Sequence, residues 1–202
     1  ITKSVREIKV LRKVFSDFVN SLISHNHKSP HMKQLFLFPT ELEARSFREL
    51  CPDAEIVISG VGMAETAATI SRLSVDGSLA RRVVVLAGIA GAYADSCAVG
   101  DVVEVVTETM SELPERFRKC YNVKAYSSLR KVKANTVSRC EADDCGADVE
   151  NMEGAVLFAM AEALGFRAVE IRAVSNIVGD DFAKWDMSLA VNNLAYELQK
   201  LE

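Results

Sequence analysis

Short apolar runs alternate with amphipathic segments along most of the chain. The apolar runs lie at residues 35–38, 56–59, 83–87, 102–106 and 168–174. Each run predicts a strand, and the continuous run at 83–87 is typical of a strand buried on both faces, as in parallel sheets. Between them, apolar positions recur at helical spacing and predict helices over residues 40–50, 64–73, 154–164 and 186–201. This alternation of strands and helices predicts an α/β domain.

The first 31 residues follow a different pattern. Apolar residues recur at helical spacing from Val5 to Leu22, which predicts an amphipathic helix over residues 4–24. A polar stretch that contains Pro30 follows, and Met32 opens a sequence typical of a domain start. We therefore expect an N-terminal helix and linker over residues 1–31, and one domain over residues 32–202.

The predicted helices carry recognisable end signals. Thr40 followed by Glu43 has the spacing of a capping box. Gly165 is placed to end the third helix, and Asp186 to cap the fourth. Residues 112–133 are charged and show no clear period, so we expect an irregular surface segment there.

Length and charge narrow the possible functions. A chain of 202 residues with 49% hydrophobic residues can bury a sizeable core. No apolar run approaches 18 residues, so we expect no membrane partner. Residues 1–31 hold six Lys and Arg against two acids, so the rest of the chain carries a net charge of −8 within an overall −4. An acidic domain argues against nucleic acid as a partner.

Cysteines and histidines exclude further chemistry. The five cysteines are odd in number and follow no CxxC spacing, so we expect reduced thiols and a cytoplasmic protein. Cys140 and Cys145 could also pair or bind metal. All three histidines precede residue 32, which removes Ser-His-Asp, Cys-His and His-zinc sites from the main domain. His25, His27 and His31 could hold a metal ion, although a solvated linker is favoured.

Three polar residues occupy places where α/β folds bind ligands. Glu43 lies in the first turn of a predicted helix, Glu153 just before another, and Asn176 at the end of an apolar strand. One carboxylate could activate water as a general base, and the other could bind vicinal sugar hydroxyls. The amide could stabilise a departing purine. Taken singly, each residue is more often a helix cap, a solvated charge or a turn former.

Two glycine pairs follow predicted strands. Gly60 and Gly62 do not form a dinucleotide fingerprint, because Glu65 stands in place of the third glycine. Gly88 and Gly91 could let backbone N–H groups approach a ligand, or could simply form a tight turn. Trp185, the single tryptophan, could pack on the last helix or form a wall of a pocket.

Five motifs in order resemble the superfamily of nucleoside phosphorylases and methylthioadenosine–adenosylhomocysteine nucleosidases. They are residues 58–62 (ISGVG), 86–92 (LAGIAGA), 99–103 (VGDVV), 149–154 (VENMEG) and 172–176 (RAVSN). Within it, the chain is most similar to futalosine hydrolases at residues 39–43 (PTELE), 151–154 (NMEG), 175–176 (SN) and 185–186 (WD). The resemblance implies a three-layer α/β/α fold with a central mixed, mostly parallel sheet. It also implies a homodimer that needs no metal or cofactor.

The resemblance also implies roles for individual residues. Glu43 would activate water, Met152 would lie under the ribose, and Glu153 would bind the ribose hydroxyls. Asn176 stands where adenine-specific members have Asp. The remaining residues expected to bind a purine nucleoside are Thr40, Gly62, Gly88, Ile89, Ala90, Val137, Asn151 and Trp185.

Two details separate the activities within the superfamily. An Asn amide can donate to O6 of a purine and accept from a protonated N7, so Asn176 favours a 6-oxopurine such as hypoxanthine. Phosphorylases need cations to hold phosphate, and no Lys or Arg is adjacent in sequence to Gly60–Gly62 or Gly88–Gly91. We therefore expect hydrolysis of a futalosine-like nucleoside.

Three alternatives remain open at this stage. They are a phosphate-dependent phosphorylase, an adenine-releasing nucleosidase, and a relative that binds nucleosides without catalysis. The last is suggested by the segment between Glu108 and Asn135, which is shorter than in the family.

Overall fold

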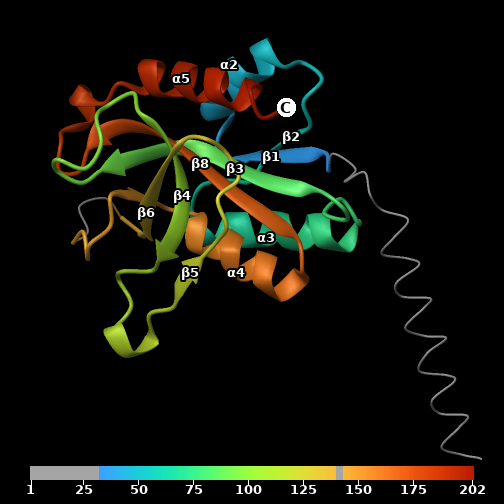
Figure 1. Ribbon diagram of the computed structural model, residues 1–202, viewed down its shortest axis with the longest axis horizontal. Coiled ribbons are helices and arrows are strands. Elements are labelled where there is room, and N and C mark those ends of the chain that lie inside the picture. Colours follow the sequence, from blue (N-terminus) through green and yellow to red (C-terminus); the bar gives the residue numbers. More distant parts are fainter. Residues whose placement is uncertain (1–31, 140–142) are drawn as a thin grey trace, which may run out of the picture. The chain divides into compact units, whose positions relative to one another are not determined.

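Eight strands form one mixed sheet in the computed structural model, which describes residues 32–139 and 143–202 (Figure 1). The predicted N-terminal helix lies outside the described residues. The strands are β1 (Gln34–Phe38), β2 (Ile56–Ile58), β3 (Val83–Ala92), β4 (Val102–Thr109), β5 (Cys120–Asn122), β6 (Arg130–Thr136), β7 (Val149–Asn151) and β8 (Arg167–Ile177). Most neighbouring pairs are parallel, while β3–β7, β4–β5 and β4–β8 are antiparallel. The predicted α/β class is confirmed.

Part of the sheet closes on itself. β8 pairs with both β3 and β4, β4 pairs with β6, β6 with β7, and β7 returns to β3. These five strands therefore form a closed ring of hydrogen-bonded neighbours. The closure places residues from β3, β7 and β8 around one space.

Helices cover the sheet on two sides (Figure 1). α2 (Glu41–Leu50) packs with α5 (Met187–Gln199) on one side, and α3 (Gly62–Val75) packs with α4 (Gly154–Leu164) on the other. Thr40 caps α2 and Asp186 caps α5 through their side chains, as predicted. Gly165 ends α4 with a φ of 75°, a conformation that favours glycine.

The core consists of the apolar runs seen in the sequence. Leu35, Leu37 and Phe38 in β1 are fully buried, and Phe36 packs its ring against Phe47 of α2 with centroids 4.6 Å apart. Each side chain of this size contributes about 1.5–3 kcal/mol when it is fully buried. This core fixes the strand ends that carry the polar residues.

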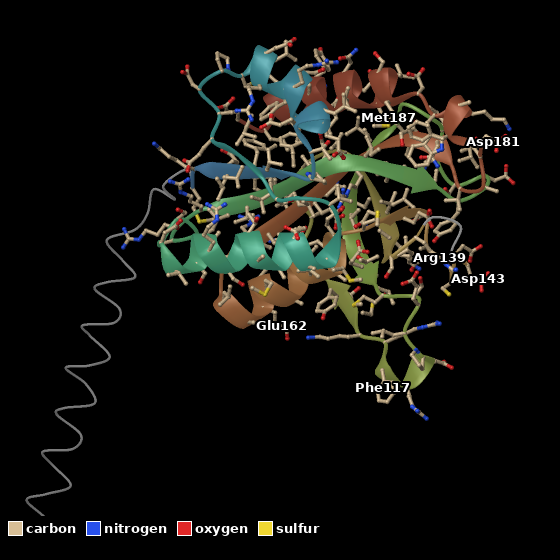
Figure 2. The ribbon with its side chains drawn as sticks, turned by 180° about the vertical axis from the view of Figure 1, so that it is seen from behind. Phe117, Arg139, Asp143, Glu162, Asp181 and Met187 are labelled. Atoms are coloured by element: carbon tan, nitrogen blue, oxygen red, sulfur yellow. The ribbon has the colours of Figure 1, made fainter. Side chains whose placement is uncertain are left out.

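Three local predictions were wrong. Gly88–Gly91 continues β3 rather than following it, because its backbone pairs with β8 from Gly88 to Ala92 and this pairing overrides the low strand propensity of glycine. The short strand β7 was missed. The segment 112–133 is not wholly irregular: it holds β5, the start of β6 and the 3-10 turn η1 (Glu115–Phe117), where Phe117 points away from the sheet (Figure 2).

Candidate active site

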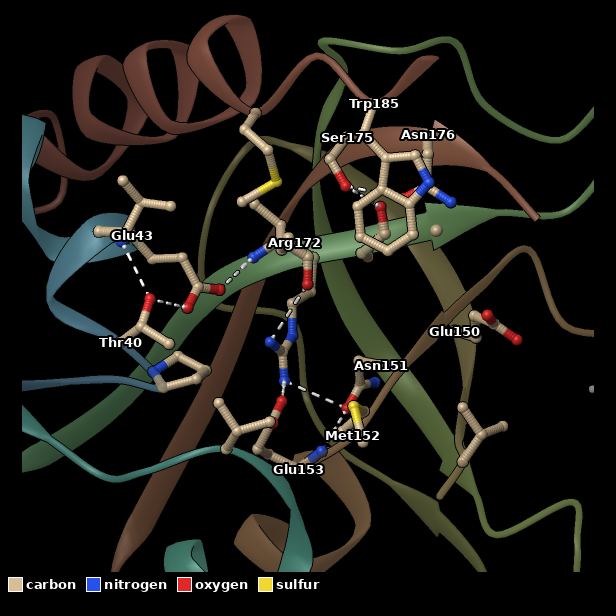
Figure 3. A pocket seen from close by; sticks show the side chains of 18 residues that line it. Thr40, Glu43, Glu150, Asn151, Met152, Glu153, Arg172, Ser175, Asn176 and Trp185 are labelled. Carbon is tan, nitrogen blue, oxygen red and sulfur yellow. Dashed lines mark hydrogen bonds and ion pairs between the residues drawn. The ribbon is translucent and has the colours of Figure 1, made fainter. Parts of the chain in front are cut away.

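A cavity of about 280 Å³ opens where β1, β3 and β8 reach their carboxyl ends (Figure 3). This is the edge at which open α/β sheets bind ligands. Ten of the twelve residues predicted to form the site line it: Thr40, Glu43, Ile89, Ala90, Val137, Asn151, Met152, Glu153, Asn176 and Trp185. The other two, Gly62 and Gly88, lie directly behind its polar side chains. The structure therefore gathers residues from distant parts of the chain around one cavity.

Glu43 reaches into the cavity from the first turn of α2. Its Oε2 accepts a hydrogen bond from Thr40 Oγ1 at 2.6 Å, and its Oε1 accepts from the backbone N–H of Ile89 at 3.0 Å. Glu43 is buried, with an exposed fraction of 5%. Burial raises the pKa of Glu43 above its ordinary value, although Thr40, Ile89 and the Arg172 charge oppose the shift. A buried carboxylate of raised pKa is a better proton acceptor than a solvated one.

Glu153 is held from two sides at the start of α4. Its Oε1 accepts from the N–H of Gly62 at 2.8 Å, and its Oε2 accepts from Arg172 Nη2 at 3.0 Å. Each carboxylate oxygen has a second acceptor position. Glu153 can therefore accept hydrogen bonds from two hydroxyl groups of a ligand without losing its protein partners.

Arg172 is the residue that sequence analysis overlooked. The guanidinium is fully buried and donates to Glu170 Oε1 at 2.8 Å, to Glu153 Oε2, and to Asn151 Oδ1 at 3.1 Å. A Cβ added at Gly88 would meet both Arg172 Nη1 and Glu43 Oε1 at 2.8 Å, so glycine is needed here for the two groups to approach. The signal in the sequence was a Glu and an Arg two residues apart inside an otherwise apolar strand.

The position of Arg172 also corrects the argument about cations. No Lys or Arg adjoins Gly88 in sequence, but the fold brings the Arg172 guanidinium to it. Buried carboxylates of Glu170 and Glu153 neutralise that guanidinium. Because the Arg172 guanidinium is already paired with two carboxylates, it is a poor candidate for holding phosphate.

A different set of groups lies on the far side of the cavity from Glu43 (Figure 3). Asn176 Oδ1 accepts from Ser175 Oγ at 2.8 Å, and its Nδ2 donates to the carbonyl of Ile177 at 3.2 Å. Trp185 stands over them and donates from Nε1 to the carbonyl of Asp180 at 3.4 Å. We call Ser175, Asn176 and Trp185 the amide end, and Glu43, Arg172 and Glu153 the carboxylate end.

Glu150 is a second polar residue that sequence analysis did not assign to the site. It lines the cavity from β7 and accepts from the hydroxyl of Tyr93 at 3.2 Å. Burial raises the pKa of Tyr93, so this hydroxyl stays protonated as a donor. A Cβ added at Gly91 would lie 3.2 Å from Asn176 Nδ2 and 3.4 Å from Glu150 Cγ. Gly91 therefore keeps open the space between Glu150 and the amide end.

Comparison with known proteins identifies the fold. A family model described as "Phosphorylase superfamily" matches residues 123–201. Residues 123–201 therefore resemble this superfamily in sequence. The predicted resemblance to nucleoside phosphorylases and methylthioadenosine–adenosylhomocysteine nucleosidases is thereby confirmed. No curated protein matches the sequence.

Solved structures of this fold superimpose over most of the chain. The 5'-methylthioadenosine nucleosidase of Arabidopsis thaliana matches with a TM-score of 0.70 and 15% identity, covering 84% of this chain and 93% of its own. A futalosine hydrolase mutant of Helicobacter pylori strain 26695 matches with a TM-score of 0.70 and 12% identity, covering 84% and 98%. The 5'-methylthioadenosine/S-adenosyl homocysteine nucleosidase of Campylobacter jejuni matches with a TM-score of 0.68 and 17% identity, covering 84% of this chain and 96% of its own.

Among residues 32–139 and 143–202, no group of three or more His, Cys, Asp or Glu side chains is arranged to hold a metal ion. None of their helices is both long and apolar enough to cross a membrane.

Proposed function

We propose that this protein hydrolyses the N-glycosidic bond of a purine nucleoside. The observation that carries the proposal is the carboxylate end: a buried Glu43 of raised pKa beside a second carboxylate, Glu153, fixed by Arg172. The relatives of the same fold include nucleosidases that act on methylthioadenosine and a futalosine hydrolase. A proton acceptor and a binder of vicinal hydroxyls are the two groups that such a reaction needs at the sugar.

In the proposed reaction Glu43 removes a proton from water, and the water oxygen forms a bond to C1′ of the ribose. The C1′–N9 bond breaks and its electron pair leaves with the purine. Glu153 accepts hydrogen bonds from the ribose hydroxyls while positive charge develops on the sugar. The proton taken up by Glu43 returns to solvent or to the purine. Overall, the ribose gains the hydroxyl of the water and the released purine gains a proton.

The amide end supports a 6-oxopurine as the leaving group. Asn176 Nδ2 makes only a 3.2 Å hydrogen bond to a backbone carbonyl, so it can turn to donate to O6. An adenine has a donor at that position and would meet the Asn176 N–H unfavourably. A futalosine-like substrate that releases hypoxanthine is therefore the specific form of the proposal, and an adenine-releasing nucleosidase is the second candidate because several relatives carry that activity.

Hydrolysis is favoured over phosphorolysis by charge. The cation of the cavity, Arg172, is bound by Glu170 and Glu153, and Glu43 lies beside it. A phosphate dianion placed there would face carboxylates rather than free cations. Water carries no charge and meets no such repulsion.

We also propose that the protein works as a homodimer. Leu42 and Val61 line the cavity yet are 49% and 51% exposed, and Phe182 beside Trp185 is 74% exposed. Apolar side chains gathered at the rim of a site favour coverage by a second chain. Sedimentation of the purified protein tests this point, and a monomer at working concentrations would refute it.

The deciding experiment incubates the protein with futalosine, inosine and methylthioadenosine, each with and without phosphate. Chromatography should show hypoxanthine released from futalosine without phosphate. Adenine release from methylthioadenosine would select the second candidate, and release only with phosphate would identify a phosphorylase. Nucleoside binding without any release would indicate a binding protein.

A further inference from the structure

Two carboxylic side chains meet behind the carboxylate end of the cavity. Glu108 on β4 and Glu170 on β8 are both 0% exposed, and their carboxyl groups meet although Glu170 pairs with Val105 in the sheet. Both converge on Gly154, the first residue of α4. A Cβ added there would lie 2.6 Å from Glu108 Oε2 and closer still to Glu170 Oε2. The proposed reaction assigns no role to either carboxyl group.

Their hydrogen bonds are unequal. Glu108 accepts from Thr136 Oγ1 at 2.8 Å, and Asn151 Nδ2 approaches its two oxygens at 3.3 and 3.2 Å. Glu170 Oε1 accepts from Arg172 Nε, but Glu170 Oε2 is buried and meets no N–H or hydroxyl donor among the described residues. A buried acceptor without a donor is costly. A proton on Glu108 that points to Glu170 supplies the missing donor.

The charges around the pair lead to the same assignment. Glu170 and Glu153 bind the Arg172 guanidinium directly, Glu43 lies beside it, and Glu108 lies behind Glu170. If all four carboxyl groups were ionised, this buried cluster would carry a net charge of −3. Burial, reinforced by the Glu170 carboxylate, raises the pKa of Glu108 well above its ordinary value, and Thr136 and Arg172 only partly oppose the shift.

We propose that Glu108 and Glu170 form one positioning unit that shares a single proton, with Glu108 as donor and Glu170 as acceptor. The unit positions Glu153 through two chains of hydrogen bonds. Glu170 fixes Arg172, which binds Glu153. Glu108 fixes the amide of Asn151, whose Oδ1 accepts from the backbone N–H groups of Glu153 and Gly154 at 2.9 and 2.7 Å. Both chains of hydrogen bonds end at Glu153, which the proposed function assigns to the ribose. The expected effect on catalysis therefore rests on that proposed function.

Glutamine substitutions test the shared proton. In Glu108→Gln the amide donates permanently to Glu170, and in Glu170→Gln it donates to an ionised Glu108. Either single variant keeps one donor and one negative charge, so turnover should stay within a few-fold of the wild type. The double variant Glu108→Gln/Glu170→Gln leaves Arg172 without that charge, and its kcat should fall on the order of 100-fold through misplacement of Glu153. Equal losses in the single and double variants would overturn the shared-proton unit.

Thermal unfolding gives a readout that does not depend on substrate. A group whose pKa is raised in the folded state costs stability as pH rises above its unfolded value of 4.5. Glu108→Gln removes this cost, so its Tm should exceed that of the wild type by an amount that grows with pH. A residue that merely makes hydrogen bonds would instead be destabilised by the substitution.

Glu104 provides the matched control on the same strand. It is 1% exposed and accepts from Tyr126 N, Ser127 N and Ser127 Oγ. Burial alone would raise its pKa, but these hydrogen bonds lower it overall. Glu104→Gln should therefore lose stability at neutral pH, the opposite sign to Glu108→Gln.

Infrared spectroscopy at neutral pH completes the test. The wild type should show the carbonyl band of a protonated, buried carboxylic acid, and Glu108→Gln should lack it. An unchanged band, or a Glu108→Gln variant as destabilised as Glu104→Gln, would overturn the assignment. If no nucleoside is cleaved, the proposed function is refuted. The unfolding and infrared results would still decide whether Glu108 carries the shared proton.

Discussion

At the carboxylate end of the cavity every charged side chain meets fixed partners, whereas at the amide end the side-chain N–H donors make long hydrogen bonds. Glu153 and Arg172 share a 3.0 Å ion pair and are each tied to further groups. Asn176 Nδ2 and Trp185 Nε1 donate over 3.2 and 3.4 Å to single backbone carbonyls. Preorganised charge serves a reaction centre, and adaptable amides serve recognition. The contrast suggests that chemistry and base selectivity can be altered separately.

The largest expected effect comes from Glu43→Gln. Gln keeps the size of the side chain but cannot take a proton from water, so kcat should fall by on the order of 10²–10⁴-fold with little change in KM. Steady-state kinetics with the substrate found by chromatography provides the measurement. Thermal unfolding controls for folding, and unchanged turnover would remove Glu43 from its proposed role.

The next largest effect concerns stability. Arg172→Met leaves Glu170 and Glu153 buried without their cation, which should cost about 3–5 kcal/mol of unfolding free energy. Urea denaturation measures this loss. Arg172→Lys keeps the charge but loses the forked geometry, so it should fall between the wild type and Arg172→Met. If Arg172→Met is as stable as the wild type, Arg172 does not stabilise the fold by neutralising Glu170 and Glu153.

Asn176→Asp tests the amide end. An Asp accepts from an adenine amine and repels the O6 of a 6-oxopurine, so the preference for hypoxanthine over adenine release should fall roughly tenfold or more, about 1–3 kcal/mol. The ratio of kcat/KM for the two nucleosides is the measurement. Because the carboxylate end is untouched, activity should shift between substrates rather than vanish. An unchanged ratio would show that Asn176 does not read the base.

A smaller effect is expected on the pH profile. Glu43 must be ionised to act as base, and its pKa is raised, so activity should fall on the acid side at a pH above the ordinary Glu value of 4.5. Thr40 donates to Glu43 and lowers its pKa. Thr40→Val should therefore move this limb to higher pH, while Thr40→Ser, which keeps the hydroxyl, should not. A limb that stays in place in both variants would argue against Glu43 as the titrating group.

Much of the fold could be predicted from the sequence because burial follows apolar runs. Leu35–Phe38 and Val83–Ala87 are continuous apolar stretches and became central strands. The strand β7 was missed because its three residues include two polar ones, and it exists only through pairing with β3 and β6. Such pairing is a tertiary effect that local sequence does not encode.

The site was predicted unevenly for a similar reason. Glu43, Glu153 and Asn176 could be found because each lies at the end of a recognisable element. Arg172 lies within β8, where Glu170 two residues away was the one local signal and nothing in the chain indicated that Glu153 would also neutralise it. Its role depends on contacts between β8, α4 and β3, and these are visible only in the folded molecule.

The closed ring of strands has a consequence for the order of assembly. β8 is the last strand of the chain, yet it lies between β3 and β4, which are both made much earlier. Pairing partners so far apart in sequence must wait for a costly loop closure. During synthesis the pocket therefore cannot form until β8 has left the ribosome, and until then β3 and β4 wait with unpaired edges.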